Sequence, residues 1–170
     1  MPFELQFDPA LITGLAARFG YTEDDRCLAA GRAARRRGFY TRDEFLLVCA
    51  WKTPRSRPKV AVNDEEAVRR ATAGALAAID ERERLEALTA LTGVGVPTAS
   101  TLLFFAFPDD YPILDVRALE SLGQKGRSTY PASFWLEYLA ACRRLALEHD
   151  VSVRTLDKAL WQHSKERVTG

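Results

Sequence analysis

A turn between two apolar segments holds the residues best suited to bind another molecule. Its glycines, Gly93 and Gly95, are followed by Pro97 and Ala99. We expect both glycines to adopt backbone angles closed to other residues, and the tip of the turn carries no large side chain. Unpaired N–H groups and the positive end of the helix dipole coincide where the next helix starts, which favours an anion. The sequence therefore predicts an anion-binding helical hairpin over residues 85–107.

An aspartate further along the chain is the candidate reactive group. Asp115 follows the uncharged segment Tyr111–Leu114 and precedes a short predicted helix. A fixed carboxylate can stabilise positive charge on a sugar ring, and it can orient or deprotonate a water molecule. Asp115 is also a candidate helix N-cap, and one side chain can fill both roles. Taken alone, this aspartate is better explained as a helix cap.

The leucine spacing around the glycines predicts a helix-hairpin-helix motif, which binds a phosphate backbone without reading base sequence. We expect contacts with double-stranded DNA from Gly93, Val94, Gly95 and Thr98. No lysine lies at the tip, so backbone amides would make the contact, and binding would weaken with salt. The alternative is an ordinary tight hairpin, because glycine between helices is common.

The eight residues 52–59 include four cations and no acidic residue, and they follow the aromatic ring of Trp51. We expect Lys52, Arg55 and Arg57 to contact phosphates and Trp51 to stack on a base. A solvated loop with Trp51 in the core explains the same pattern, and Lys52 is alternatively a nucleophile. The candidates for the wall of a base pocket, which core packing also explains, are the aromatic residues Tyr40, Trp51 and Trp135.

The order of hairpin, apolar helix, extended segment, aspartate and helix resembles the helix-hairpin-helix base-excision DNA glycosylases, the superfamily of endonuclease III and the alkyladenine and adenine glycosylases. The match covers about residues 88–122. In that superfamily the aspartate faces the sugar of a flipped nucleotide. Asp115 matches that position, so the resemblance makes residues 111–116 the candidate catalytic turn. The resemblance implies a monofunctional DNA N-glycosylase that hydrolyses the bond between the sugar and a modified or mispaired base.

Departures from the family pattern bear on lyase activity and cofactors. Pro97 stands where members that also cut the backbone have a lysine for a Schiff base, so no lyase activity is expected. Cys142 is the only cysteine near the C-terminus, so no iron–sulfur cluster and no other cofactor is expected. The family's hairpin holds a monovalent cation through backbone carbonyls. By position, these carbonyls would be those of Thr89, Leu91 and Val94.

Composition limits the function classes. The 170 residues include 24 Lys and Arg against 23 Asp and Glu, a formal net charge of +1, which excludes a polybasic coat or membrane anchor. Three cysteines fit no zinc ribbon and favour a reducing compartment. Residues 87–108 are uncharged, but glycines and a proline would break a membrane-spanning helix there. We expect a cytoplasmic protein, associated with the nucleoid if it binds DNA, and without a membrane or obligate protein partner.

Start and stop signals predict an all-α domain of eight or nine helices over residues 1–170. Thr41/Glu44 and Asn63/Glu66 are expected capping boxes. The expected N-caps of three further helices are Asp8, Asp115 and Ser152. Two loops are also expected, one enforced by Pro54 and Pro58, and one over residues 123–128 that divides two small lobes with a cleft.

Two other functions remain open from the sequence. One is a non-catalytic helix-hairpin-helix DNA-binding module, which would use the same hairpin as a clamp. The other is a protein-interaction helical domain with a fortuitous hairpin. Clustering of Arg55, Arg57 and Lys59 on the hairpin face would disfavour the latter, because a cationic surface at the turn suits a phosphate backbone.

Overall fold

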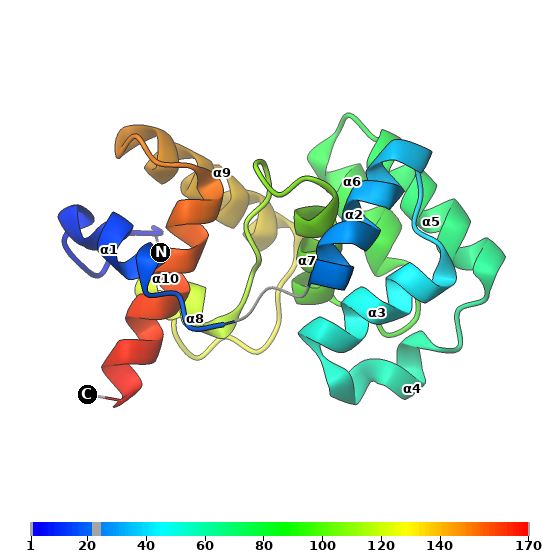
Figure 1. Ribbon diagram of the computed structural model, residues 1–170, viewed down its shortest axis with the longest axis horizontal. Coiled ribbons are helices and arrows are strands. Elements are labelled where there is room, and N and C mark those ends of the chain that lie inside the picture. The colour runs from blue at the N-terminus through cyan, green and yellow to red at the C-terminus, as the bar shows by residue number, and fades with distance from the viewer. Residues whose placement is uncertain (1, 22–24, 170) are drawn as a thin grey trace. The chain divides into compact units, whose positions relative to one another are not determined.

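A computed structural model describes residues 2–21 and 25–169, and within them the fold is entirely helical (Figure 1). The ten α-helices in these two ranges are α1 (Ile12–Ala17), α2 (Asp25–Arg37), α3 (Arg42–Lys52), α4 (Arg57–Val60), α5 (Glu65–Ala77), α6 (Glu81–Thr89), α7 (Val96–Ala106), α8 (Val116–Ser121), α9 (Ala132–Glu148) and α10 (Val153–Thr169). The same ranges contain two 3-10 helices, η1 (Pro9–Leu11) and η2 (Pro54–Ser56). The predicted all-α class is confirmed.

The chain divides into two compact units. Unit 1 comprises Met1–Thr22 and Asp109–Gly170, and unit 2 comprises Glu23–Pro108. The boundaries therefore lie near residues 22 and 108. The prediction that the loop 123–128 divides two lobes is wrong, because that loop lies inside unit 1 and connects two of its helices.

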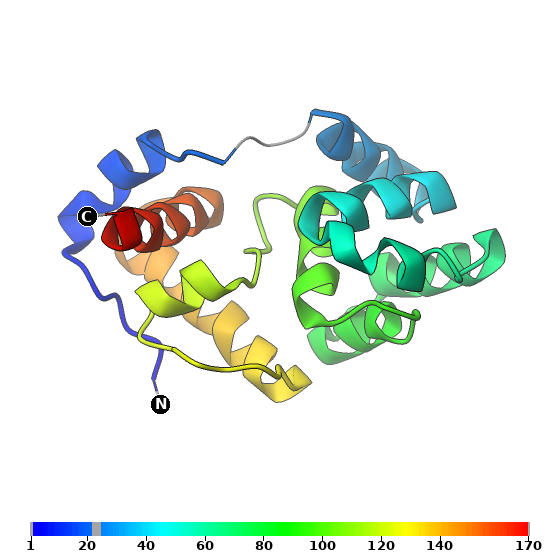
Figure 2. The same ribbon diagram turned by 90° about the horizontal axis from the view of Figure 1, so that it is seen from below.

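In unit 1, α10 lies between α1 and α8 (Figures 1 and 2). The core of unit 1 contains several aromatic rings. The ring centroid of Phe3 lies 5.3 Å from that of Phe134 and 5.9 Å from that of Tyr138. Trp135 and Tyr138 of α9 are completely enclosed. Large rings bury much apolar surface each, so a few of them suffice to hold the helices of this small unit together.

In unit 2, α7 is the central helix, with α2, α3 and α6 packed against it. Every side chain from residue 98 to residue 106 is buried, as expected of an uncharged helix that is apolar all round. The crossing with α2 is close: a Cβ added at Gly31 would lie 1.9 Å from the carbonyl oxygen of Phe105. Glycine is thus required at the crossing of these two helices.

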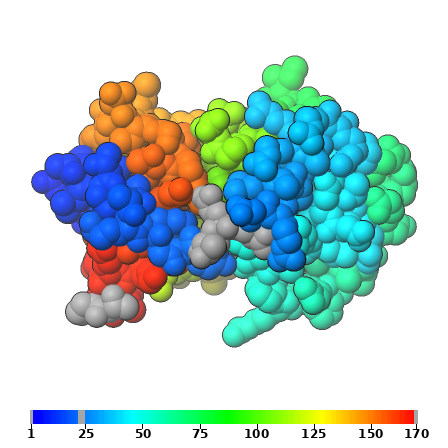
Figure 3. Space-filling model, viewed as in Figure 1, coloured from blue at the N-terminus to red at the C-terminus, as the bar shows by residue number. Residues whose placement is uncertain are grey.

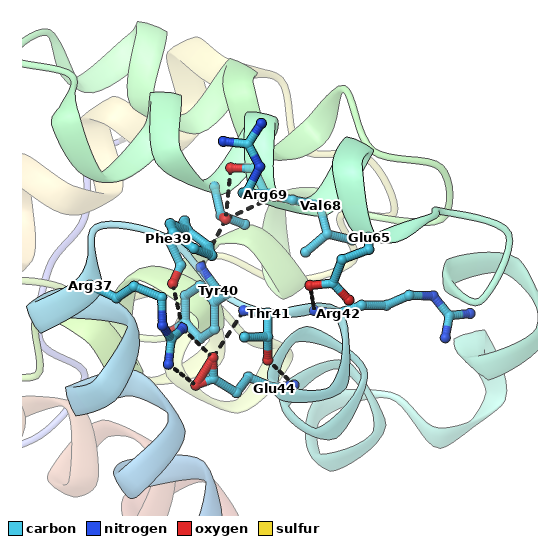
Figure 4. Close-up of polar contacts among 10 residues, drawn as sticks. Arg37, Phe39, Tyr40, Thr41, Arg42, Glu44, Glu65, Val68 and Arg69 are labelled. Carbon is cyan, nitrogen blue, oxygen red and sulfur yellow. Dashed lines mark hydrogen bonds and ion pairs between the residues drawn. The ribbon is translucent and has the colours of Figure 1, made fainter.

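The predicted caps at Asp8, at Thr41 with Glu44 and at Ser152 are confirmed. Thr41 and Glu44 form a complete capping box at α3, and Arg37 adds an ion pair to Glu44 at 2.7 Å (Figure 4). Ser152 Oγ accepts the Thr155 amide at 3.0 Å at the start of α10. The cap contacts of Thr41 and Ser152 each join residues three apart, so the sequence spacing is sufficient to find them.

The prediction that Pro54 and Pro58 enforce a loop is wrong, because residues 54–60 form η2 and α4. Pro54 and Pro58 lie in the first turns of η2 and α4, where the missing amide hydrogen has no cost. With α4, the described residues contain ten α-helices, more than the eight or nine predicted. Among the described residues, no helix is both long and apolar enough to cross a bilayer.

Candidate functional site

The turn between α6 and α7, residues 90–95, has different requirements at its two glycines. Gly93 has φ +77°, a left-handed conformation that favours glycine. Gly95 has φ −91° and ψ 179°, ordinary extended backbone that any residue adopts. The prediction that both glycines need special backbone angles is therefore wrong for Gly95. Its added Cβ would meet only Pro97 Cδ, at 3.8 Å, so internal packing does not require glycine there.

Backbone amides at this turn are available to a ligand. Among the described residues, no acceptor pairs with the amides of Gly93, Gly95, Val96 and Thr98. The amide of Val94 is different, because it donates to Leu91 O at 3.2 Å. Val94 can therefore be removed from the amides expected to contact phosphate. The remaining donors lie at or beside the start of α7, where the helix dipole is positive.

Asn63 holds the turn in place. Its Nδ2 donates to Thr92 O at 2.9 Å, and its Oδ1 accepts from Thr92 N at 3.0 Å. The predicted capping box at Asn63/Glu66 is wrong: Asp64 caps α5 by accepting from Ala67 N at 2.8 Å. The side chain of Asn63 is used for a tertiary contact that joins two segments distant in sequence.

The hairpin turn also packs directly on α4. A Cβ added at Gly93 would lie 2.8 Å from Lys59 Cβ and 3.0 Å from Val60 N. Arg42 fixes the residues that follow α4, since its guanidinium donates to the carbonyls of Ala61 and Asn63 at 2.7 and 2.8 Å. The backbone amide of Arg42 in turn donates to Glu65 (Figure 4). Helix α4 and the hairpin turn are thus one continuous surface within unit 2.

The basic segment, Lys52–Lys59, carries Lys52, Arg55, Arg57 and Lys59. Arg55, Arg57 and Lys59 are exposed and Lys52 is half-buried; the turquoise segment around α4 forms part of the visible surface of unit 2 (Figure 3). None of the four has an ion pair within residues 25–108 or elsewhere in the described chain. Other arginines of unit 2 do pair, for example those in Arg37–Glu44, Arg69–Glu66 and Arg82–Glu86.

The aromatic candidates for a base pocket lie mainly in the cores of the units. Tyr40 is buried and its hydroxyl donates to Leu102 O at 2.6 Å. Trp135 is completely enclosed and stacks on Tyr111, and its Nε1 has no acceptor among the described residues. Trp51 is half-buried with its ring edge-on to Phe105, at 5.0 Å. Of the three, only Trp51 retains substantial exposure for contact with a base.

Asp115 occupies the predicted N-cap of α8. Its Oδ1 accepts from Ala118 N at 2.7 Å, and the residue is half-buried. The preceding residues Tyr111–Leu114, the approach segment, are all buried. The cap holds one carboxylate oxygen at the helix N-terminus, where a negative charge is stabilised. Asp115 is thus a fixed charge at the end of a buried extended segment.

Sequence reasoning missed Asp157, a second carboxylate near Asp115. Asp157 lies on α10 and is 5% exposed. Burial raises its pKa from 3.8 to about 6, Arg154 opposes this rise, and the charge of Asp115 adds to it. The available signal is its register, because Asp157 lies between the buried positions Leu156 and Leu160 of an amphipathic helix.

The last sequence prediction to compare with the structure is the cation site at the hairpin. Leu91 O accepts the Val94 amide at 3.2 Å and retains a second lone pair, so the cation site at the carbonyls of Thr89, Leu91 and Val94 stays a prediction. Within the described residues, no group of three or more His, Cys, Asp or Glu side chains could hold a metal ion.

Comparisons of the chain with protein-family models, curated proteins and solved structures found no match.

Proposed function

We propose that this chain binds the backbone of double-stranded DNA through unit 2 and hydrolyses the N-glycosidic bond of a modified or mispaired base through Asp115. It would thus be a monofunctional DNA N-glycosylase with a helix-hairpin-helix motif. The observation that carries the proposal is the packing of the hairpin turn on α4: Gly93 contacts the backbone of Lys59 and Val60, which joins free amides to unpaired cations.

Binding would use two kinds of donor on one surface. The amides of Gly95, Val96 and Thr98 can receive a phosphate oxygen at the start of α7. Arg55 and Arg57 can neutralise neighbouring phosphates and release their counterions. Both donor types contact the backbone, so they position the protein without selecting a base sequence. A protein-interaction domain gives no reason for this combination of cations and amides.

Hydrolysis would depend on the Asp115 carboxylate. As the C1′–N bond breaks, its electron pair leaves with the base, and C1′ acquires positive charge that the carboxylate stabilises. Water adds its oxygen to C1′ and gives a proton to Asp115. Asp115 then passes this proton to solvent or to the departing base. The target base must first leave the stack, at a cost of a few kcal/mol that damage or mispairing lowers. We assign no step to a cation or cluster.

A non-catalytic DNA clamp is the second candidate. The observation that favours it is the hydrogen bond from Ala118 N to Asp115 Oδ1, because a helix cap explains this aspartate without any reaction. The clamp would use the same hairpin turn and basic segment. The two functions differ only in base release, and a DNA-binding measurement alone does not separate them.

The two glycines of the turn provide a test of phosphate approach. Gly95→Ala should leave the melting temperature unchanged, because neither φ nor packing resists a methyl group there. It should weaken duplex binding about tenfold, because the methyl group lies beside the amides that would hold the phosphate. Gly93→Ala should lower the melting temperature, since Lys59 Cβ lies 2.8 Å from the added atom. Wild-type affinity in a stable Gly95→Ala protein would rule out this phosphate site.

The basic segment makes a separate prediction about salt. Replacing Arg55 and Arg57 by glutamine should reduce the slope of log affinity against log salt concentration by about 2, since each lost phosphate contact contributes about 0.9. The loss should be equal for duplexes of unrelated sequence. The matched control replaces Arg69 and Arg70 of α5, which changes net charge equally. Fluorescence anisotropy at several salt concentrations measures both, and equal slopes for the two variants would exclude the basic segment from the interface.

A further inference from the structure

Asp157 is a carboxylate in the core of unit 1. It lies on α10, and its neighbours Leu156 and Leu160 are completely buried. A buried carboxylate is unfavourable unless an opposite charge and hydrogen-bond donors compensate it. The groups that Asp157 contacts therefore indicate why a charge is tolerated in this core.

The contacts of Asp157 converge on the approach segment that leads to Asp115. Asp157 Oδ2 accepts from Ile113 N at 3.3 Å and from Arg154 Nη1 at 2.7 Å. The carbonyl group of Ile113 is also bound, because Tyr138 Oη donates to Ile113 O at 2.8 Å. Side chains of α9 and α10 thus hold both polar groups of Ile113, two residues before Asp115.

Burial, Arg154, Asp115 and the Ile113 amide together set the pKa of Asp157. Arg154 lies on its own helix, Asp115 caps α8, and Tyr138 and Cys142 face it from α9. Burial raises the pKa of Asp157 to about 6, and burial also raises the pKa of Tyr138 and of Cys142. The negative charge of Asp115 contributes to the raised pKa of Asp157.

The raised pKa of Asp157 makes the free energy of unfolding depend on pH. The folded protein binds this proton more tightly than the unfolded chain, whose ordinary pKa is 3.8. From Asp157 alone, the unfolding equilibrium constant should therefore rise about 100-fold as the pH increases from below 3.8 to above 6. The ionised side chain is less favourable for folding than the protonated one, which indicates a role other than stability.

We propose that Asp157 is a positioning residue for Asp115: its ionised side chain holds Ile113 through a charge-assisted hydrogen bond, and so fixes the approach segment and the carboxylate that follows it. Protonation of Asp157 removes the ion pair with Arg154 and leaves a weaker, neutral hydrogen bond to Ile113. The position of Asp115 thus depends on pH. This inference rests on the proposed function for its catalytic meaning, whereas the contact itself can be tested without DNA.

The first test follows the Ile113 amide by NMR in the full-length protein without DNA. In the wild type, its chemical shift should titrate with a midpoint near pH 6. Asp157→Asn should remove the titration, and Asp115→Asn should move the midpoint to lower pH because the neighbouring negative charge is gone. Ser164→Ala is the matched control, because Ser164 is buried on the same helix and contacts Glu120; it should leave the midpoint unchanged.

An Ile113 amide that does not titrate, or that titrates equally in Asp157→Asn, would overturn the inference whatever the protein does to DNA. A midpoint that Asp115→Asn leaves in place would remove the link between the two carboxylates. These results do not depend on base release. The contact and the proposed function can therefore fail separately.

The second test uses base release from a lesion-containing duplex. Wild-type kcat should rise with pH through a midpoint near 6, and Asp157→Asn should keep the low-pH value throughout, with KM unchanged. Ser164→Ala should retain the wild-type profile. A uniform loss of kcat with an unaltered pH profile in Asp157→Asn would show a merely structural role and contradict positioning. A wild type that releases no base from any lesion would refute the proposed function, and the NMR result would still decide whether Asp157 holds Ile113.

Discussion

Asp115→Asn should lower base release by roughly 10³-fold, while duplex affinity and melting temperature remain at wild-type values. The carboxylate is the proposed stabiliser of positive charge on the sugar, and removal of one such group typically costs this much in rate. Asparagine caps a helix as well as aspartate does, so its side-chain oxygen can still accept from Ala118 N. The loss would therefore report the missing charge and not a damaged α8.

The measurement is single-turnover release of bases from duplexes that each carry a different lesion. Asp109→Asn is the control, because Asp109 is an exposed aspartate of the same unit; it should behave as the wild type. Equal release by the wild type and Asp115→Asn would remove Asp115 from the chemistry. Normal duplex binding with no release from any lesion would establish the non-catalytic clamp in place of the enzyme.

Gly31→Ala should destabilise unit 2 by about 3 kcal/mol or more, within the upper range for overpacked cores. The added methyl carbon would lie 1.9 Å from Phe105 O and 2.3 Å from Phe105 C. Both atoms belong to the backbone of α7, so a side-chain rotation cannot relieve the clash. The helices α2 and α7 would have to separate, and the melting temperature should fall by about 10 °C or more.

Gly74→Ala provides a control with the opposite sign. Gly74 also lies within a helix, but its added Cβ would meet only Ala87 Cβ, at an ordinary 3.9 Å. Alanine is favoured over glycine inside a helix by about 0.5–1 kcal/mol, so this variant should melt slightly higher than the wild type. A Gly31→Ala protein that melts with or above Gly74→Ala would contradict the close crossing of α2 and α7.

Binding and chemistry are proposed for different units, and this separation helps to interpret variants. The hairpin turn and basic segment belong to unit 2, whereas Asp115 and Asp157 belong to unit 1. Substitutions in the hairpin turn or the basic segment should change duplex affinity. Substitutions of Asp115 or Asp157 should change base release after binding. A variant of one unit that affects only the function assigned to the other would argue against the proposed division.

Several tertiary contacts could not be predicted from the sequence. Asn63 fits a capping box by spacing, yet its side chain bonds to Thr92, and Asp64 caps the helix. Gly93 and Gly95 look equivalent in the sequence, but only Gly93 has positive φ and packs on Lys59. Such contacts join residues about thirty positions apart, and local propensity contains no information about them.

The sequence alone determined the helical class and most helix starts, because a cap such as Thr41 with Glu44, or Asp115 with Ala118, joins residues three positions apart. It also identified Asp115 and the basic segment as chemically distinctive. Two contacts are visible only in the tertiary structure: the packing of α4 on the hairpin turn, and the hydrogen bond from Ile113 N to the buried Asp157. Burial and long-range packing depend on how all the helices share one core, and each helix's own pattern is compatible with more than one such arrangement.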